Sequence, residues 1–304
     1  MADPAGSTAS GDPRRLAVLG SPIGHSLSPA LHAAAYTALG LPWQYGAADV
    51  AEGALGAFLD TLGPDWRGLS LTMPLKHEII PFLADLDRVA SLTRAVNTVL
   101  FDEDPADGSP RRLTGFNTDV PGLVRALAEA GTDRAAHVTV VGAGATAASA
   151  VATAAELGAE SVEIIARTPA RAEPLGALAR QLGLTVAING LDALPDPARQ
   201  TDLVLSTLPG GVSLPGEFAL GIRESVLLFD VGYAPWPSAL ARSWADAGGQ
   251  SRSGLTMLLH QALVQVRIFV GGDPFEPLTD EDSVLRQMRA ALPESAAPVR
   301  AVEG

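Results

Sequence analysis

The sequence predicts an α/β protein of two domains, in which helices cover parallel sheets, and three observations lead to this. The chain has 304 residues, of which 47% are hydrophobic and 18% are charged, enough for about two globular domains with ample core. Strand-like and helix-like segments alternate along it, as in parallel sheets covered by helices. A glycine-rich turn near residue 142 joins such a strand to such a helix, as in doubly wound folds.

The first half contains two predicted strands, a helix and a hairpin. LAVLG (16–20) and LSLT (69–72) are predicted strands. PALHAAAYTALG (29–40) is a predicted helix, with a proline in its first turn and a glycine at its end. VNTVLF (96–101) and RRLTGF (111–116) flank the turn-rich segment DEDPADGSP, which predicts a hairpin.

The second half continues with a short helical segment and then HVTVVGAGATAASAVATAAELG, which predicts strand, turn and helix. Four further strands are predicted in VEIIA, LTVAIN, LVLSTL and VLLFDV, and the last strong helix covers 254–272. The domain boundary is expected near residue 120, with the helices of 254–290 folding back onto the first half. Residues 1–13 are small, polar and rich in proline and glycine, which predicts a disordered tail.

Composition and charge argue against several classes of protein. The formal net charge is −13 and the sequence pI is near 4.7, which disfavours nucleic acid and anionic membranes as partners. There are no cysteines, so disulfides and thiolate metal sites are excluded. No apolar run reaches the ~18 residues of a membrane span. The N-terminus lacks a signal-peptide core, so the expected location is the cytoplasm.

The segment VVGAGATAASA contains a GxGxxA pattern after a predicted strand. Gly142 permits the tight turn, Gly144 lets the backbone approach a pyrophosphate, and Ala147 lets the helix lie close to the strand. The N–H groups of the helix N-terminus then meet the anion. The pattern therefore predicts a dinucleotide-binding site, although glycines also serve ordinary strand-to-helix turns.

The next strand, in SVEIIARTPARAE, favours NADP over NAD. An NAD site usually places an acidic residue at the end of this strand to hold the ribose hydroxyls. Ala166 stands there, followed by Arg167, Thr168 and Arg171, which suit a 2′-phosphate. The alternative is that the two arginines are solvated surface charges.

The segment GSPIGHSLSPALH places Ser26 and Ser28 two residues apart, just before a helix. In an extended segment both would face the same side, and two hydroxyls beside a helix N-terminus suit a carboxylate. Ser28 alone could instead be an N-cap before a proline. His25 and His32 are interpreted as structural residues, and no metal site is expected.

Two Asn-Thr pairs lie on the two arms of the predicted hairpin, in AVNTV and GFNTD. If the hairpin closes symmetrically, Asn97 and segment 117–119 arrive at the same end and could line a site for a polyhydroxylated substrate. The alternative is that both are strand-end turns, which favour Asn and Asp. On the last helix, Met257 and Gln261 share one face, and Gln261 could reach the same site.

Lys76 is the only lysine in a chain that contains 20 arginines. An arginine keeps its proton at ordinary pH, whereas a lysine can release it when its surroundings help. Lys76 is therefore a candidate proton-transfer group. The alternative is that one surface lysine remains by chance.

Together these segments resemble the shikimate dehydrogenase family over about residues 16–290. The resemblance is carried, in the family's order and spacing, by GSPIGHSLSPALH, LTMPLK, AVNTV, GFNTD, VVGAGATAASA, ARTPARAE, STLPGG, DVGYAPWPSAL and GLTMLLHQA. It implies an α/β substrate domain and a Rossmann-type, doubly wound NADP domain with a cleft between them. The predicted division is a disordered tail (1–13), a substrate-binding domain (14–119 and 254–290), an NADP-binding domain (120–253) and a flexible tail (291–304).

The resemblance also implies a role for each matching position. Lys76 and Asp119 would form the catalytic pair. The substrate residues would be Ser26 and Ser28 at the carboxylate, Thr72, Asn97 and Gln261 at the ring hydroxyls, and Tyr233 at the carboxylate end. Ala145, Thr207, Gly254 and Met257 would join the glycine turn and the arginines in binding the cofactor.

Four positions depart from the family pattern. Ser70 replaces the usual asparagine of Asn-Val-Thr, which implies a shorter contact. Ala166 replaces an asparagine before the cofactor arginine and removes one contact with the adenosine end. Arg94 and Ala145 stand where glycines are usual. None of these departures removes a catalytic group.

The implied activity is the reversible reduction of 3-dehydroshikimate to shikimate with NADP(H), by a monomer or homodimer that needs no metal. Two alternatives remain open. One is a quinate/shikimate or aminoshikimate dehydrogenase on the same scaffold. The other is a non-catalytic sensor that binds NADP or shikimate.

Overall fold

The computed structural model describes residues 12–102, 111–196 and 198–293. They form two compact units. The first unit contains the chain up to Asp85, together with Asn97–Gly115 and Gln265–Leu292, and the second contains Leu86–Val96 and Phe116–Val264.

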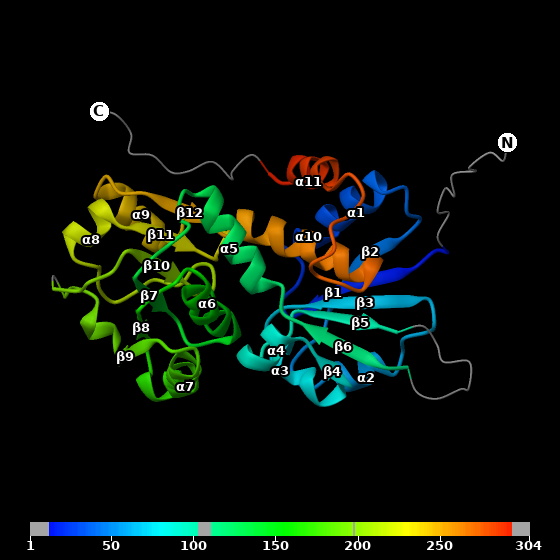
Figure 1. The fold of residues 1–304 in the computed structure, drawn as a ribbon, viewed down its shortest axis with the longest axis horizontal. Helices are drawn as coiled ribbons and strands as arrows, with labels where there is room; N and C mark the ends of the chain where they lie inside the picture. Colours follow the sequence, from blue (N-terminus) through cyan, green and yellow to red (C-terminus); the bar gives the residue numbers. More distant parts are fainter. Residues whose placement is uncertain (1–11, 103–110, 197, 294–304) are drawn as a thin grey trace. The chain divides into compact units, whose positions relative to one another are not determined.

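The first unit is built on a mixed sheet with the strand order β2-β1-β3-β5-β6-β4 (Figure 1). β1 is parallel to both β2 and β3, whereas β5 is antiparallel to β3. The strands are β1 (Arg15–Gly20), β2 (Gln44–Asp49), β3 (Trp66–Leu71), β4 (Asp85–Leu86), β5 (Thr98–Phe101) and β6 (Leu113–Phe116).

Short helices and two longer ones accompany this sheet. α11 packs against α1, so this C-terminal helix belongs with the first helix of the same unit. The helices are α1 (Ser28–Ala38), α2 (Leu55–Leu59), α3 (Leu75–Glu78), η1 (Ile80–Phe82) and α11 (Glu281–Ala290). α10 (Leu255–Gly271) begins in the second unit and ends in the first.

The second unit contains a fully parallel sheet in the order β12-β11-β10-β7-β8-β9. Counted from β7, this is the order of a doubly wound dinucleotide-binding fold, and the chain reverses direction across the sheet between β7 and β10. The strands are β7 (His137–Val141), β8 (Ser161–Ile165), β9 (Thr185–Asn189), β10 (Leu203–Ser206), β11 (Leu227–Asp230) and β12 (Ser251–Ser253). The predicted Rossmann-type fold is confirmed.

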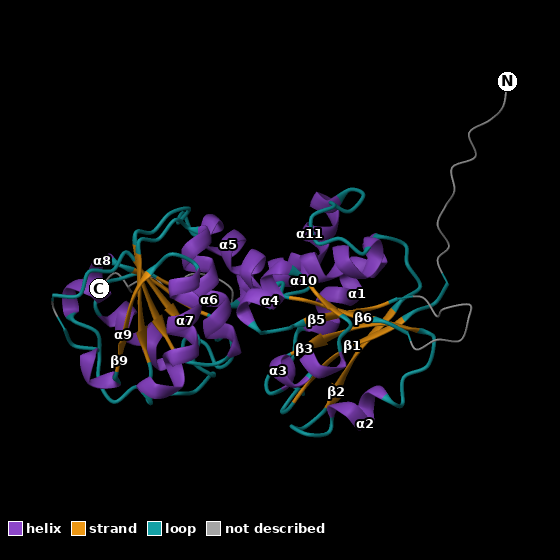
Figure 2. Cartoon of the chain, turned by 60° about the horizontal axis from the view of Figure 1, so that its bottom comes forward, coloured by secondary structure: helices purple, strands orange, loops and turns teal. Residues whose placement is uncertain are grey.

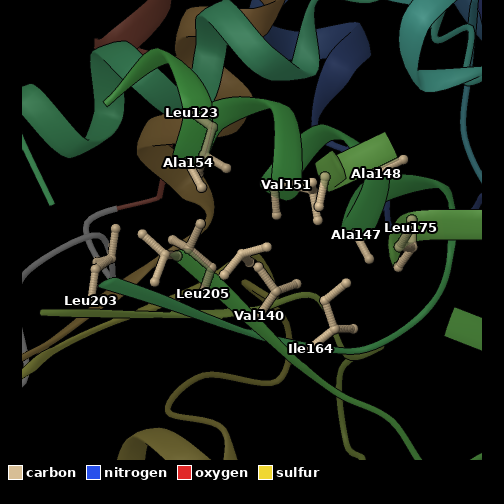
Figure 3. Close-up of a cluster of buried hydrophobic side chains, with 14 of the residues drawn as sticks. Leu123, Val140, Ala147, Ala148, Val151, Ala154, Ile164, Leu175, Leu203 and Leu205 are labelled. Atoms are coloured by element: carbon tan, nitrogen blue, oxygen red, sulfur yellow. The ribbon is translucent and has the colours of Figure 1, made fainter. Parts of the chain in front are cut away.

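Helices cover both faces of this sheet, which Figure 2 shows from another side. One face carries an apolar cluster in which residues such as Leu123, Val151 and Leu175 pack on Val140 and Ile164 (Figure 3). A second cluster includes Trp244 and Phe218. The helices are α4 (Arg88–Thr93), α5 (Asp119–Glu129), α6 (Ala145–Glu156), η2 (Pro169–Ala172), α7 (Glu173–Gln181), η3 (Leu191–Ala193), α8 (Leu220–Ser225) and α9 (Ala239–Asp246).

Candidate functional site

In the first unit, two loops meet where the parallel strands β1 and β3 end. Gly20 closes β1, and a side chain at this position would collide with the methyl group of Thr72. Ser21 N–H donates to the carbonyl of Met73 at 3.0 Å. The missing Cβ of Gly20 therefore lets the segment that leads to the serines lie against the segment that leads to Lys76.

We expected an extended backbone at Ser26 and Ser28, but the structure shows a turn there. Leu27 already has helical angles and is the N-cap of α1, without a side-chain cap bond. Ser28 is therefore the first helical residue rather than an N-cap, and it is buried (5% exposed). Its N–H donates to Ser26 Oγ at 3.3 Å, so the short turn still brings the two serines together.

Lys76 lies on α3, which starts four residues after β3 ends. Its side chain is partly exposed, as is that of Thr72. Glu78 braces this helix, because its carboxylate accepts from the N–H groups of Gly53 and Leu55 at 3.1–3.3 Å. The candidate proton-transfer group is thus carried by an anchored turn.

Asn97 precedes β5 and is buried (2% exposed). Its carbonyl accepts from Leu71 N at 2.8 Å and from Gln265 Nε2 at 3.2 Å, and its Oδ1 accepts from the Thr98 hydroxyl at 3.0 Å. Gln265 Nε2 also donates to Thr98 Oγ1 at 2.9 Å. The position of Asn97 thus depends on both neighbouring strands and on α10.

The other side of the Gln265 amide joins a buried polar cluster. Gln265 Oε1 accepts from Ser70 Oγ at 3.0 Å and lies 3.1 Å from His32 Nε2. Tyr45 donates to Ser70 at 2.6 Å, and its ring stacks on His32 with centroids 3.9 Å apart. Burial lowers the pKa of His32 to about 3, so its ring is neutral, and the structural interpretation of His32 fits this environment.

In the second unit, the glycine turn has the predicted backbone requirements. Gly142 has φ +123°, and a side chain there would collide with the Thr207 hydroxyl. That hydroxyl donates to the carbonyl of Val141 at 3.0 Å, which ties the ends of β7 and β10 together. Gly144 would meet no heavy atom within 4 Å if it gained a Cβ, and Ala145 starts α6. The turn therefore leaves room beside a helix N-terminus at the point where the strand order reverses.

The predicted phosphate-binding residues follow β8, the strand next to β7. Arg167, Thr168 and Arg171 are all exposed. Ala166 is 3% exposed and packs in the apolar cluster on one face of the sheet. The loop therefore presents two cations and a hydroxyl to solvent, while the residue that departs from the family pattern belongs to the core.

Asp119 is the first residue of α5 and is buried (4% exposed). Asn117 Oδ1 accepts from the N–H groups of Asp119 and Val120 at 3.0 and 3.3 Å. The Asn117 amide nitrogen is within 2.9–3.1 Å of Thr93 Oγ1, the Ala95 carbonyl and Ser149 Oγ. The turn interpretation of this Asn-Thr pair is therefore confirmed for Asn117, which fixes the start of α5 and with it the backbone of Asp119.

The remaining predicted residues lie on or near α10. Gln261 Oε1 accepts from Thr118 at 3.2 Å, and a Cβ on Gly122 would lie 2.7 Å from that of Gln261, so α5 and α10 are in close contact. Gly254 packs so tightly on the backbone of Val231 that any side chain would collide. The last two residues differ in environment: Met257 belongs to the apolar cluster of this unit, whereas Tyr233 is partly exposed and burial raises its pKa.

The structure thus assigns the predicted residues to two sets, one in each unit. The first unit carries Ser26, Ser28, Thr72, Lys76 and Asn97, and the second carries Asp119, Gly142, Gly144, Ala145, Arg167, Thr168, Arg171, Thr207, Tyr233, Gly254, Met257 and Gln261. Sequence reasoning missed Gln265, which contacts Ser70, Asn97 and Thr98. The available signal was a second glutamine, one turn after Gln261, within the apolar run QALVQVRIFV.

In the part of the chain that the structure describes, no group of three or more His, Asp or Glu side chains could hold a metal ion. Within the same residues, no helix is both long enough and apolar enough to cross a membrane.

Comparisons with known proteins connect the two units to one family. Residues 18–99 match the shikimate dehydrogenase substrate-binding domain, and residues 116–219 match the C-terminal domain of alanine dehydrogenase/PNT. The shikimate dehydrogenase (NADP(+)) of Rubrobacter xylanophilus is 35% identical over 273 residues, covering 87% of this chain and 93% of the relative. That of Methanothermobacter thermautotrophicus is 32% identical over 278 residues, covering 89% and 95%.

Solved structures agree. The shikimate dehydrogenase of Mycobacterium tuberculosis has a TM-score of 0.75 and 34% identity, covering 91% of this chain and 100% of that one. The shikimate 5-dehydrogenase of Thermus thermophilus, solved in complex with NADP(H) and shikimate, has a TM-score of 0.73 and 32% identity, covering 92% and 100%. The chain described here belongs to the shikimate dehydrogenase family.

Proposed function

We propose that this chain catalyses the reversible, NADPH-dependent reduction of 3-dehydroshikimate to shikimate. The observation that carries the proposal is the family match over the strand ends of the first unit, where the Ser26, Thr72 and Lys76 motifs come together. The same match extends over both units in relatives that bear this activity in their names.

The second unit fits the cofactor on its own geometry. The open space at Gly144 and the N-terminus of α6 suit a pyrophosphate, and exposed Arg167, Thr168 and Arg171 suit a 2′-phosphate. When bound, NADPH supplies the hydride for the carbon that carries the oxygen. We assign Thr207, Gly254 and Met257 to the cofactor by their motif positions, with the first two also shaping the backbone around it.

The first unit supplies most of the proposed substrate contacts. Ser26 and Ser28 would bind the carboxylate beside the N-terminus of α1, with Tyr233 at the same end of the substrate. Thr72, Asn97 and Gln261 would bind ring oxygens. These roles rest on the motif positions and on the polar character of the residues.

Lys76 would donate a proton to the oxygen as the hydride arrives, and would take it back in the oxidative direction. Asp119 would orient the ammonium and share the proton-transfer network, aided by Asn117, which fixes the start of its helix. A positioned acid of this kind contributes about 10²–10⁴-fold to the rate.

The direct test follows NADPH or NADH absorbance with 3-dehydroshikimate as substrate. We expect turnover with NADPH, and binding of shikimate without any turnover would instead favour the sensor. Oxidation of shikimate, quinate and aminoshikimate with NADP would distinguish the related dehydrogenases. A preference for quinate or aminoshikimate would overturn the proposed substrate.

Lys76→Arg tests the proton-transfer role, because arginine keeps the charge but cannot release a proton. We expect the variant to fold and bind NADP while kcat falls about 10²–10⁴-fold. The single lysine allows a second test, since an amine-selective acylating reagent has two targets, Lys76 and the N-terminal amine. Acylation at Lys76 should abolish activity in proportion, and shikimate with NADP should slow it. Full turnover after complete acylation of Lys76 would refute the role.

We further propose a cytoplasmic enzyme that works as a monomer or homodimer. The functional division we propose places 14–119 and 254–290 with the substrate and 120–253 with NADP. Sedimentation of the purified chain would measure its oligomeric state.

A further inference from the structure

In the buried cluster around Gln265, the donor and the acceptor of each hydrogen bond can be assigned, because one group of the cluster can only accept. The main-chain carbonyl of Asn97 has no hydrogen to give, so the Gln265 atom 3.2 Å from it must be the nitrogen Nε2. Oε1 then faces Ser70 Oγ at 3.0 Å and His32 Nε2 at 3.1 Å. The orientation of this amide therefore follows from the chemistry of its neighbours.

The groups behind Gln265 keep the same direction. Ser70 donates to Gln265 Oε1 and accepts from Tyr45 at 2.6 Å. The neutral ring of His32 carries its hydrogen on Nε2, toward Gln265, and its Nδ1 accepts from Tyr36 at 3.2 Å. This assignment gives every polar group of the cluster a partner, so the donor and the acceptor of each hydrogen bond are fixed.

The assignment of donors and acceptors extends through Thr98 to the side chain of Asn97. Gln265 Nε2 donates to Thr98 Oγ1 at 2.9 Å. Because an amide nitrogen cannot accept, the Thr98 hydroxyl hydrogen goes elsewhere, and it is donated to Asn97 Oδ1 at 3.0 Å. The oxygen of the Asn97 amide thus faces Thr98. Nδ2, which has two hydrogens and no lone pair to accept with, lies on the other side of that amide.

We propose that Gln265 and Thr98 are positioning residues that hold Asn97 with Nδ2 as the donor to a ring oxygen of the substrate. This inference rests on the proposed function, in which Asn97 binds ring oxygens. A hydroxyl or carbonyl oxygen accepts such a bond, whereas a ring ammonium in the same place has no lone pair for it. The network therefore selects an oxygen substituent at this position.

Thr98→Val tests the proposal, because valine keeps the branched shape and removes the hydroxyl. We expect kcat/KM for 3-dehydroshikimate to fall about tenfold, as for the loss of one oriented hydrogen bond, with the KM for NADPH unchanged. Thr98→Ser should restore most of the activity. The matched control is Thr139→Val, since Thr139 is equally buried in β7 of the second unit and its hydroxyl bonds Thr201 at 3.1 Å. The control should leave the KM for 3-dehydroshikimate unchanged.

Gln265→Glu tests the other positioning residue. A carboxylate can only accept, so it would face the Asn97 carbonyl without a hydrogen, and we expect the same substrate-specific loss. If Thr98→Val keeps the wild-type kcat/KM, the proposal is overturned. A wild-type chain that does not reduce 3-dehydroshikimate would overturn the proposed function instead, so the two failures are distinguishable.

A spectroscopic test reads the amide directly. The chain contains three asparagines, at 97, 117 and 189, so isotope-labelled asparagine gives three side-chain amide signals in nuclear magnetic resonance. We expect shikimate to shift the Nδ2 hydrogens of Asn97 and slow their exchange with water. Asn117 and Asn189 lie outside the proposed site, donate to protein groups and serve as internal controls. Asn97 hydrogens that keep their ligand-free shifts and exchange rates would overturn the assignment of Nδ2 as the donor.

Discussion

The glycine turn of the second unit and the Gln265 cluster of the first unit are organised by different means. In the second unit the glycine turn depends on space and backbone angle, with Gly142 at φ +123° and Gly144 left open. In the first unit, buried side chains bond to one another, and Gln265 on α10 contacts residues of β3, β5 and α1. One region is defined by what is missing at glycines and the other by hydrogen bonds between buried polar groups.

The difference matches what each unit is proposed to bind. Binding a pyrophosphate requires N–H donors and a backbone that can come close to the phosphates, and the main chain provides both. Binding a ring with several oxygens requires donors and acceptors in a fixed arrangement, which side chains provide. The second unit should therefore be sensitive to added volume, and the first to altered polarity.

The largest expected effect is that acid destabilises the first unit. His32 has a pKa of about 3 in the folded chain, against 6.5 for the free side chain. The unfolded chain therefore binds the proton more readily. The contribution of neutral His32 to the free energy of unfolding is fully present above pH 6.5 and declines as the pH falls toward 3. At about 1.4 kcal/mol for each unit of pKa difference, this amounts to several kcal/mol.

In the second unit the signs are opposite. Burial raises the pKa of Asp87 and Asp230, so the cost of their charges appears as the pH rises and is relieved by acid.

Denaturant unfolding at several pH values tests the effect of His32. The free energy of unfolding should fall with decreasing pH, and His32→Gln should reduce the slope of this dependence. His25→Gln, at an exposed histidine, should keep the wild-type slope. An unchanged slope in His32→Gln would show that His32 does not cause the acid sensitivity of the first unit.

Next in size are alanine substitutions at two glycines of the same turn. Gly142→Ala would force a side chain into a strained backbone conformation and against Thr207, so we expect a loss of about 1–3 kcal/mol in the free energy of unfolding. Gly144→Ala has no such clash and should keep its stability, yet weaken NADP binding because the added Cβ obstructs the pyrophosphate. Thermal unfolding and NADP titration of both variants would measure this contrast, which equal stability losses would contradict.

Arg167→Ala probes whether cofactor choice depends on a side chain even in the second unit. Losing a charge-assisted bond to a 2′-phosphate should weaken NADP binding by about 1.5–3 kcal/mol, while NAD use stays nearly unchanged. Initial rates with each cofactor give the two KM values. Arg180→Ala, at another exposed arginine of the same unit, is the control. If both cofactors weaken equally in Arg167→Ala, the arginine has a structural role.

The smallest expected effect concerns Arg94, which stands where the family usually has glycine. Arg94 ends α4 with φ +53°, a left-handed conformation that costs a side-chain-bearing residue about 1–2 kcal/mol. Arg94→Gly should therefore raise the free energy of unfolding by up to about 1 kcal/mol, since the more flexible unfolded chain offsets part of the gain. A denaturation midpoint at or below the wild-type value would show that contacts of the arginine outweigh the strain.

Much of the fold was predictable, because buried parallel strands are continuous apolar runs and helix ends carry glycine or proline. The hairpin arms, the glycine turn and the last helix all lie within a few residues of their predicted positions. β2 was missed because QYGAAD is a largely exposed edge strand without an apolar run. β4 and β12, of two and three residues, are too short to show a period.

The site was predictable only where its residues form local motifs. Lys76 stands out as the single lysine, and Gly142 and Gly144 stand out by their spacing. The cluster of His32, Tyr45, Ser70, Thr98 and Gln265 draws one residue from each of five distant segments, so no local pattern marks it. Arg94 could not be interpreted from sequence because a backbone angle explains it, and the expectation for Ser26 and Ser28 assumed extended backbone where Leu27 is helical.

The path of the chain through α10 has a consequence for the order of biosynthesis. Among the described residues, all of the second unit except Pro293 has been made once the chain reaches Val264, whereas the first unit also needs Gln265–Leu292. On the ribosome, β1, β2 and β3 therefore emerge first yet wait longest, with His32 and Ser70 lacking the amide that satisfies them. The unit made first should be the last to reach its native state, and a chain truncated after Val264 should keep a folded second unit while its first unit stays incomplete.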